Sequence, residues 1–341
     1  MPAAVENRKK SWFHRALPAL TLMIMAPLIA EVLPGATRIS SIFVFPIEIV
    51  IWGGGAVMAR YFVRRLRLGW GNLLLLALAL AVAEECLIQQ TSFAPLVIKL
   101  KGVEYGREWG FNYVYFVWAM LYEALFVVLV PVGLTELIFR DRKNQPWLSG
   151  WGIGTICVLF IPACRAAWFG WTQIARTQVF HMPAYTLPLP LAGAGAAAVA
   201  VLVFAALGPA RRLLAAPARP LTPPHPLVLF GLGVLVSVAV FGIEIVAFGI
   251  APQVPTAAPV AAGIGLAFAI AATAPRFMAD ARWSAAHDVG ALYGATLGNF
   301  AVMFLAFQGA APLDLYGKIV LDAAAVLLMV WLMLARGGRK A

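Results

Sequence analysis

The sequence contains little charge and few reactive side chains. Only 12% of its 341 residues are Asp, Glu, Lys or Arg, which is about half the share in a typical soluble domain. There are three cysteines and no Cys-x-x-Cys, which argues against a disulfide framework or a thiolate zinc site. The sequence has no P-loop, so we expect no ATP-driven step within this chain.

Histidine is also scarce. The four histidines, at positions 14, 181, 225 and 287, avoid the centres of the apolar runs, which disfavours a bis-histidine haem. We identify no cofactor and expect no metal site. The formal net charge is +11, but the basic residues are spread over short loops. We therefore expect no nucleic-acid partner.

Long apolar runs dominate what remains. The chain is 62% hydrophobic with a mean hydropathy of +0.86. A run of about 20 apolar residues crosses the ~30 Å core of a bilayer. This pattern predicts an all-α, polytopic integral membrane bundle with the lipid bilayer as its surroundings. About ten spans are predicted, near 16–33, 42–62, 69–90, 110–138, 147–168, 186–207, 226–250, 257–277, 288–308 and 313–335.

Lysine and arginine fall unevenly on the two sides of these spans. When the loops alternate sides, 19 of the 26 basic residues lie on one side and 7 on the other. Cytoplasmic loops of membrane proteins carry the excess of such residues. We therefore expect both termini in the cytoplasm and the protein in the inner (plasma) membrane.

We expect residues 1–341 to form one integral membrane domain. The Pro-rich stretch 209–225 would be a cytoplasmic linker between two five-span halves, 1–208 and 226–341. Halves with an odd number of spans have opposite orientations, as in inverted-repeat transporters. Phe45–Val50 (FPIEIV) resembles Phe241–Val246 (FGIEIV). We interpret this match as chance, because the two segments lie at opposite ends of their spans.

The third span ends in an unusually polar stretch, Ala81–Gln90 (AVAEECLIQQ). An ionisable side chain at membrane depth costs a few kcal/mol, so it usually has a partner or a function. In an α-helix Glu85 and Gln89 share a face, whereas Glu84 lies about 100° away. We therefore expect the two glutamates to address different neighbours.

Other charged residues fall in the non-cytoplasmic half of the predicted spans. We interpret Glu31, Glu48 and Arg165 as structural groups near span ends, and the deeper Glu84, Glu85 and Glu123 as functional groups. Together they indicate a polar cavity open to the non-cytoplasmic side. The candidate residues for binding a substrate or ion are Glu84, Glu85, Gln89, Glu123, Trp118, Tyr122, Lys318, Asp322 and Arg165.

Two of these sets have more than one interpretation. Trp118 and Tyr122 are one helical turn apart beside Glu123 and could bind an amphipathic or cationic ligand by ring-face contacts, although aromatic residues are also common at membrane interfaces. Lys318 and Asp322 have the i, i+4 spacing of a local ion pair, or Lys318 could bind an anion. Gly290, Gly294 and Gly298 form a small-residue stripe, which favours close helix packing.

The Glu84–Glu85 pair resembles the first motif, EExxxR, of the intramembrane glutamate metalloproteases related to type II CAAX prenyl endopeptidases. Gln89 stands where that motif has arginine, and no Phe-x-x-x-His follows. We therefore assign neither that family nor its mechanism to this chain.

Three functions fit these patterns. The leading one is a secondary transporter, with Glu84, Glu85 and Glu123 coupling protons or substrate. The second is a membrane-embedded enzyme acting on a lipid or lipid-linked substrate at the outer leaflet, with the same carboxyl groups in acid, base or metal-binding roles. The third is a non-catalytic assembly subunit. The substrate and the oligomeric state stay open.

Overall fold

The computed structural model describes residues 12–97, 104–214, 219–307 and 310–337. In these ranges ten helical segments are long and apolar enough to cross a membrane, which confirms the predicted number of spans. The chain is thus a multi-pass membrane protein. The segments are His14–Val32, Ile39–Arg65, Trp70–Ile88, Tyr113–Ile138, Gly150–Val179, Leu189–Leu207, Pro226–Ile250, Ala257–Met278, Ala285–Leu305 and Pro312–Met333.

The α-helices within these spans are interrupted by turns of other types. The α-helices are α1 (Trp12–Pro27), α2 (Phe45–Glu48), α3 (Gly54–Arg65), α4 (Trp70–Ala83), α5 (Tyr113–Glu123), α6 (Val130–Ile138), α7 (Gly150–Phe169), α8 (Leu189–Leu207), α9 (Arg211–Leu214), α10 (Pro226–Glu244), α11 (Ala257–Met278), α12 (Ala285–Val302) and α13 (Pro312–Gly337). The π-helices are η1 (Leu28–Val32), η3 (Ile49–Gly53), η4 (Glu84–Ile88), η5 (Ala124–Leu129), η7 (Gly170–Val179) and η8 (Ile245–Ile250). The 3₁₀ turns are η2 (Ile39–Val44), η6 (Arg140–Arg142) and η9 (Met303–Phe307).

The structure departs from the predicted segments in two places, before the fourth span and at the end of the fifth. Strands β1 (Arg107–Glu108) and β2 (Phe111–Asn112) form a short antiparallel hairpin, with Arg107 opposite Asn112. The fifth span continues as η7 to Val179, about ten residues beyond its predicted end at 168. The predicted end of the span reflects polar residues such as Thr172 and Arg176, which interrupt the apolar run. In the structure the backbone stays helical through these residues, and both side chains are buried.

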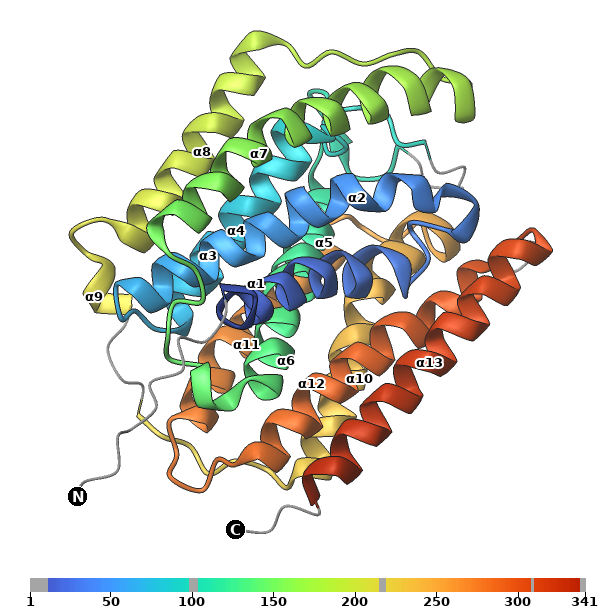
Figure 1. Ribbon diagram of the computed structural model, residues 1–341. Coiled ribbons are helices and arrows are strands. Elements are labelled where there is room, and N and C mark those ends of the chain that lie inside the picture. Colours follow the sequence, from blue (N-terminus) through green and yellow to red (C-terminus); the bar gives the residue numbers. More distant parts are fainter. Residues whose placement is uncertain (1–11, 98–103, 215–218, 308–309, 338–341) are drawn as a thin grey trace, which may run out of the picture.

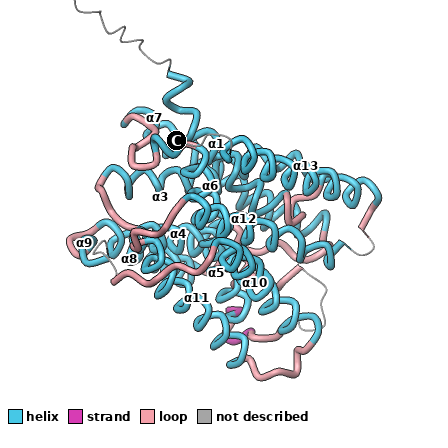
Figure 2. Tube along the Cα trace, turned by 90° about the horizontal axis from the view of Figure 1, so that it is seen from below, coloured by secondary structure: helices cyan, strands magenta, loops and turns pink. Residues whose placement is uncertain are grey.

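The bundle has a central group of helices between two outer sides. Figure 1 shows α7 and α8 along one side and α13 along the other, with α1, α4 and α5 between them. The view from below in Figure 2 gives the same order. The N-terminal helices therefore pack at the centre, where most of the buried apolar side chains lie.

Contacts near the ends of the spans define two ends of the bundle. At one end, which we call the basic end, Arg142 Nη1 donates to His14 O (2.8 Å) and Asn72 Nδ2 to Ala206 O (2.8 Å). At the opposite end Tyr105 donates to Val254 O (2.6 Å) and the Ser40 backbone N–H to Asp314 Oδ1 (2.9 Å). Successive spans thus alternate direction.

The small-residue stripe of α12 packs against α10, as predicted. A carbon added at Gly294 would collide with the Phe230 backbone, and one added at Gly290 would collide with Pro226. Ser237 donates a hydrogen bond across the same interface to Ala295 O (2.7 Å). The two backbones therefore approach closely along this face.

We predict opposite effects for two glycine substitutions at this interface. Gly294→Ala overpacks the contact and should lower the free energy of unfolding by about 1–3 kcal/mol. Gly231→Ala, on α10 with open space around it, should be neutral or stabilising by up to about 1 kcal/mol. Thermal unfolding in detergent checks both. Equal effects would contradict the close packing.

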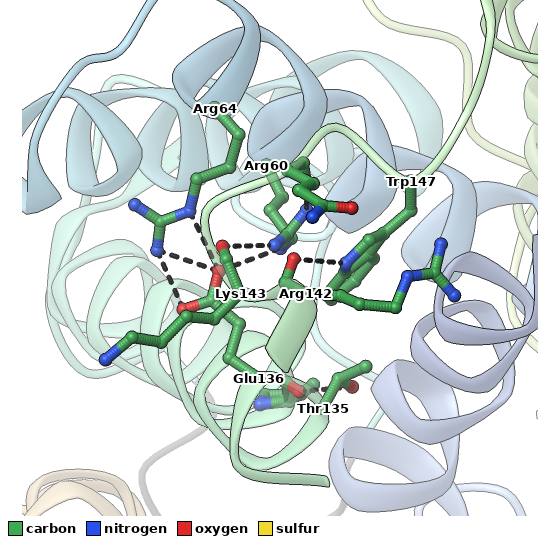
Figure 3. A network of polar contacts seen from close by, with 9 residues as sticks. Arg60, Arg64, Thr135, Glu136, Arg142, Lys143 and Trp147 are labelled. Atoms are coloured by element: carbon green, nitrogen blue, oxygen red, sulfur yellow. Dashed lines mark hydrogen bonds and ion pairs between the residues drawn. The ribbon is translucent and has the colours of Figure 1, made fainter. Parts of the chain in front are cut away.

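A buried ion network fixes the basic end (Figure 3). Glu136 accepts from Arg60 Nε (2.9 Å) and Arg64 Nη2 (2.7 Å). The Arg60 guanidinium also lies over the Trp147 ring, 3.2 Å from its centroid, and donates to Lys143 O (2.7 Å). The network ties the second span to the fourth span and to the loop that follows it.

We predict that Glu136→Gln strongly destabilises the protein, by about 3–5 kcal/mol, because it leaves two largely buried arginines without a countercharge. Asp288→Asn removes the partner of Arg140 at a more exposed pair (4.0 Å) and should change stability by at most about 1 kcal/mol. The measurement is chemical or thermal unfolding in detergent. A mild effect of Glu136→Gln would show that the network is not stabilising.

Candidate functional site

Six glutamates from five spans gather in the half of the bundle away from the basic end. We call Glu31, Glu48, Glu84, Glu85, Glu123 and Glu244 the glutamate cluster. Glu123 interacts electrostatically with Glu84, Glu85 and Glu31. Glu48 interacts with Glu84, and Glu244 with Glu85. The cluster therefore brings together residues more than 200 positions apart.

Every member of the cluster lies in a π-helical segment or directly before one. Glu31 is in η1, and Glu84 and Glu85 begin η4. The other three members each lie directly before a π-helix: Glu48 before η3, Glu123 before η5 and Glu244 before η8. π-Helical turns are rare and occur frequently at functional sites. All six members of the cluster are associated with such turns, whereas Glu136, the seventh glutamate of the described spans, lies within α6.

The π-turn also changes what the Glu84–Glu85 pair contacts. Both carboxyl groups interact with Glu123, which the α-helical spacing of the sequence did not predict. Their other neighbours do differ. Glu84 interacts with Trp52, whereas Glu85 interacts with Tyr115 and accepts a hydrogen bond from Ser92 Oγ (2.8 Å).

The centre of the cluster is closed to solvent. Glu84, Glu85 and Glu123 are 4%, 3% and 6% exposed. Glu48 accepts a hydrogen bond from Thr37. No donor in the described ranges lies within hydrogen-bonding distance of one carboxyl oxygen each of Glu48, Glu84 and Glu123. The cluster thus contains buried acceptors with unused hydrogen-bonding capacity.

The carboxyl groups of the cluster lie apart from the ion pairs of the described residues. Within the part of the chain that the structure describes, none of the six glutamates forms a salt bridge. An ionised carboxylate buried without a partner is strongly unfavourable. The cluster is therefore suited to holding exchangeable protons or a bound cation.

An aromatic wall lines the cluster on α5. Trp118 and Tyr122 are stacked at 5.1 Å between ring centroids, and Tyr115 lies 5.3 Å from Trp118. Phe241 of α10 contacts both Trp118 and Tyr122. Tyr122 donates its hydroxyl hydrogen to Ala30 O. Tyr122 interacts electrostatically with Glu31, Glu123 and Glu244, and the binding role of Trp118 and Tyr122 stays a prediction.

A loop covers the cluster at the end where we expected an open cavity. Ser92, Phe93 and Ala94 are buried there, and Ser92 bonds Glu85. Arg107 donates to Phe93 O and to Ala94 O, and Arg176 donates to Pro95 O (2.9 Å). Among the described residues, these two arginines hold the loop over the cluster by its carbonyl groups.

Just outside the spans, Tyr185 lies beside Arg176, 5.9 Å from the guanidinium to the ring centroid. Burial raises the pKa of the Tyr185 phenol, and the nearby Arg107 and Arg176 oppose that increase. Tyr185 therefore remains a neutral ring partner for Arg176.

The other candidate residues lie outside the cluster. Lys318 pairs with Asp322 (2.8 Å) and donates to the carbonyl oxygens of Leu33 and Phe300, as the local interpretation predicted. Arg165 is exposed and lies over Trp168 at 4.0 Å. Gln89 is half-buried, and its backbone N–H bonds Glu84 O.

Three cluster members were not among the predicted site residues. Glu31 and Glu48 were interpreted as structural, and Glu244 was left unassigned. The available signal was the match between Phe45–Val50 and Phe241–Val246, since each segment places its glutamate directly before a π-helix. The interpretation of that match as chance rests on the different positions of the two segments within their spans.

No family model, curated protein or solved structure matches this chain. In the described ranges, no group of three or more His, Cys, Asp or Glu side chains is placed to hold a metal ion. The function of the cluster is therefore inferred from its own geometry.

We predict that Glu123→Gln folds with stability equal to or above that of the wild type. The substitution removes an uncompensated acid that interacts with Glu84, Glu85 and Glu31, and like charges in one site oppose each other. Glu136→Gln is the matched comparison, because the same change there removes the partner of two arginines. Unfolding in detergent measures both. A large loss for Glu123→Gln would show that its carboxylate has a stabilising partner.

Proposed function

We propose that this protein is a secondary transporter of the inner membrane in which Glu84, Glu85 and Glu123 exchange protons with a transported solute. The observation that supports this proposal is a buried group of carboxyls with unused acceptors and, among the described residues, no salt bridge to a basic side chain. Carboxyl groups that share a site favour a shared, exchangeable proton. Intramembrane acids of this kind occur in proton relays of transporters.

The proposed orientation follows the distribution of basic residues. The basic end, with Arg60, Arg64 and Arg142, would face the cytoplasm, and both termini with it. The glutamate cluster would then lie nearer the non-cytoplasmic side. In the transport cycle the loop over Ser92–Pro95 would open to that side, and the described structure corresponds to the closed state.

The two five-span halves, 1–208 and 226–341, fit this proposal. Five cluster members belong to the first half, whereas Glu244 belongs to the second, so the site would lie where the halves meet. The aromatic wall of Trp118 and Tyr122 favours an amphipathic or cationic small molecule, which ring faces and carboxylates both attract. Such a cation would displace protons from the glutamates as it binds.

Proton-coupled flux in proteoliposomes tests the proposal. Vesicles containing a pH-sensitive dye would be challenged with panels of organic cations, amino acids and organic acids. We expect at least one class to move protons through the wild type. Glu84→Gln and Glu123→Gln should reduce this coupled flux about tenfold or more, since they remove the exchanging group. Glu108→Gln, an exposed acid of the hairpin, should leave it unchanged.

Two outcomes would contradict transport. Unchanged coupled flux in both Glu84→Gln and Glu123→Gln would show that these carboxyl groups do not take part in transport. Turnover of an outer-leaflet lipid by the wild type without any gradient, with no solute-dependent proton movement, would favour a membrane enzyme instead.

A further inference from the structure

The end of the first span is held by side chains from three other helices. The π-helix η1 follows α1 and ends this span. The last carbonyl groups of a helix lack intrahelical partners and form its negative pole. Asn299 Nδ2 donates to Ile29 O (2.8 Å), and Tyr122 donates to Ala30 O. Lys318 donates to Leu33 O.

One acceptor in this group has no donor. Asn299 is 1% exposed, and its Nδ2 is fixed by the bond to Ile29 O. This bond also fixes its other atom, Oδ1, as the free acceptor, and no described residue donates to it. A buried amide oxygen without a donor is unfavourable. This oxygen is therefore available as a ligand for a cation.

Two further oxygen-bearing side chains belong to the same helix end. Asn299 and Tyr122 bond the carbonyl groups of consecutive residues, Ile29 and Ala30, and Glu31 is the next residue along the chain. The Tyr122 hydroxyl also interacts with Asn299 and with the Glu31 carboxyl. Glu31 has no salt bridge within the described ranges, and it also interacts with Glu48, Glu84 and Glu85. The nearest basic side chain, Lys318, is neutralised by Asp322 at 2.8 Å. The local charge at the helix end is therefore negative.

We propose that this position is a sodium site, formed by Asn299 Oδ1, the Glu31 carboxylate and the Tyr122 hydroxyl at the end of the first span. Oxygen ligands suit a hard cation. A single positive charge would balance Glu31, whereas divalent ions are usually bound by several carboxylates. In transporters, Na⁺ sites commonly lie at interrupted membrane helices.

The sodium site extends the proposed transport function, because Na⁺ at Glu31 would act as a second coupling ion beside the protons of Glu84, Glu85 and Glu123. Its role in coupling rests on that function. Binding itself does not, so it can be measured without any substrate or gradient.

Thermal unfolding of the purified protein in detergent tests binding. NaCl would be titrated against N-methylglucamine chloride at constant ionic strength, since that organic cation is too large for a buried oxygen site. We expect the unfolding midpoint to rise with Na⁺ and to saturate. Asn299→Ala and Glu31→Gln should weaken the apparent Na⁺ affinity about tenfold or more. Asn72→Ala, a buried asparagine with both amide atoms bonded, should keep the wild-type affinity.

The results separate this inference from the transport proposal. A wild-type midpoint that does not respond to Na⁺, or a response that persists unchanged in Asn299→Ala and Glu31→Gln, overturns the sodium site. If Asn299→Ala does not fold, Asn299→Asp replaces it in the test. This variant keeps an oxygen at the position and should therefore retain Na⁺ binding. Glu123→Gln should still bind Na⁺. Binding without proton-coupled flux would overturn only the transport function.

Discussion

The cost of burying a carboxyl group without a countercharge governs the organisation of this protein. The six glutamates of the cluster lie inside an apolar bundle, and the buried Arg60 and Lys318 pair with other acids. Ionising any of these glutamates unaided is unfavourable in such surroundings. A change in the charge of the cluster therefore requires a proton or another cation to enter or leave. This constraint connects the composition of the spans to the proposed function.

Two acids in the same span illustrate how context decides the role of a glutamate. Glu136 is clamped by Arg60 and Arg64 and belongs to a fixed structural network. Glu123, thirteen positions earlier and directly before η5, has one carboxyl oxygen without a donor. The first is locked by its partners, whereas the second is held among other acids. Both are buried to a similar degree, so their partners, not their depth, distinguish them.

The π-helical segments provide the geometry that this arrangement requires. A π-turn adds a residue to the helix and shifts which side chains face the centre. In the third span it lets adjacent Glu84 and Glu85 both reach Glu123. In the first span it presents carbonyl oxygens to Tyr122 and Asn299. The same local departures therefore shape both the glutamate cluster and the proposed sodium site.

The sequence by itself determined the ten spans, their alternation and the close packing of the glycine stripe in α12, whereas its partner α10 came from the structure. These features depend on local hydrophobicity, segment length and glycine spacing, which are readable along the chain. It also identified Glu84, Glu85 and Glu123 as costly buried groups. Only the tertiary structure revealed that Glu31, Glu48 and Glu244 join them, that Arg165 does not, and that a loop closes the site. Those outcomes depend on π-turns and on contacts between spans distant in sequence, because an α-helical repeat fixes neither the register after such a turn nor the partner across the bundle.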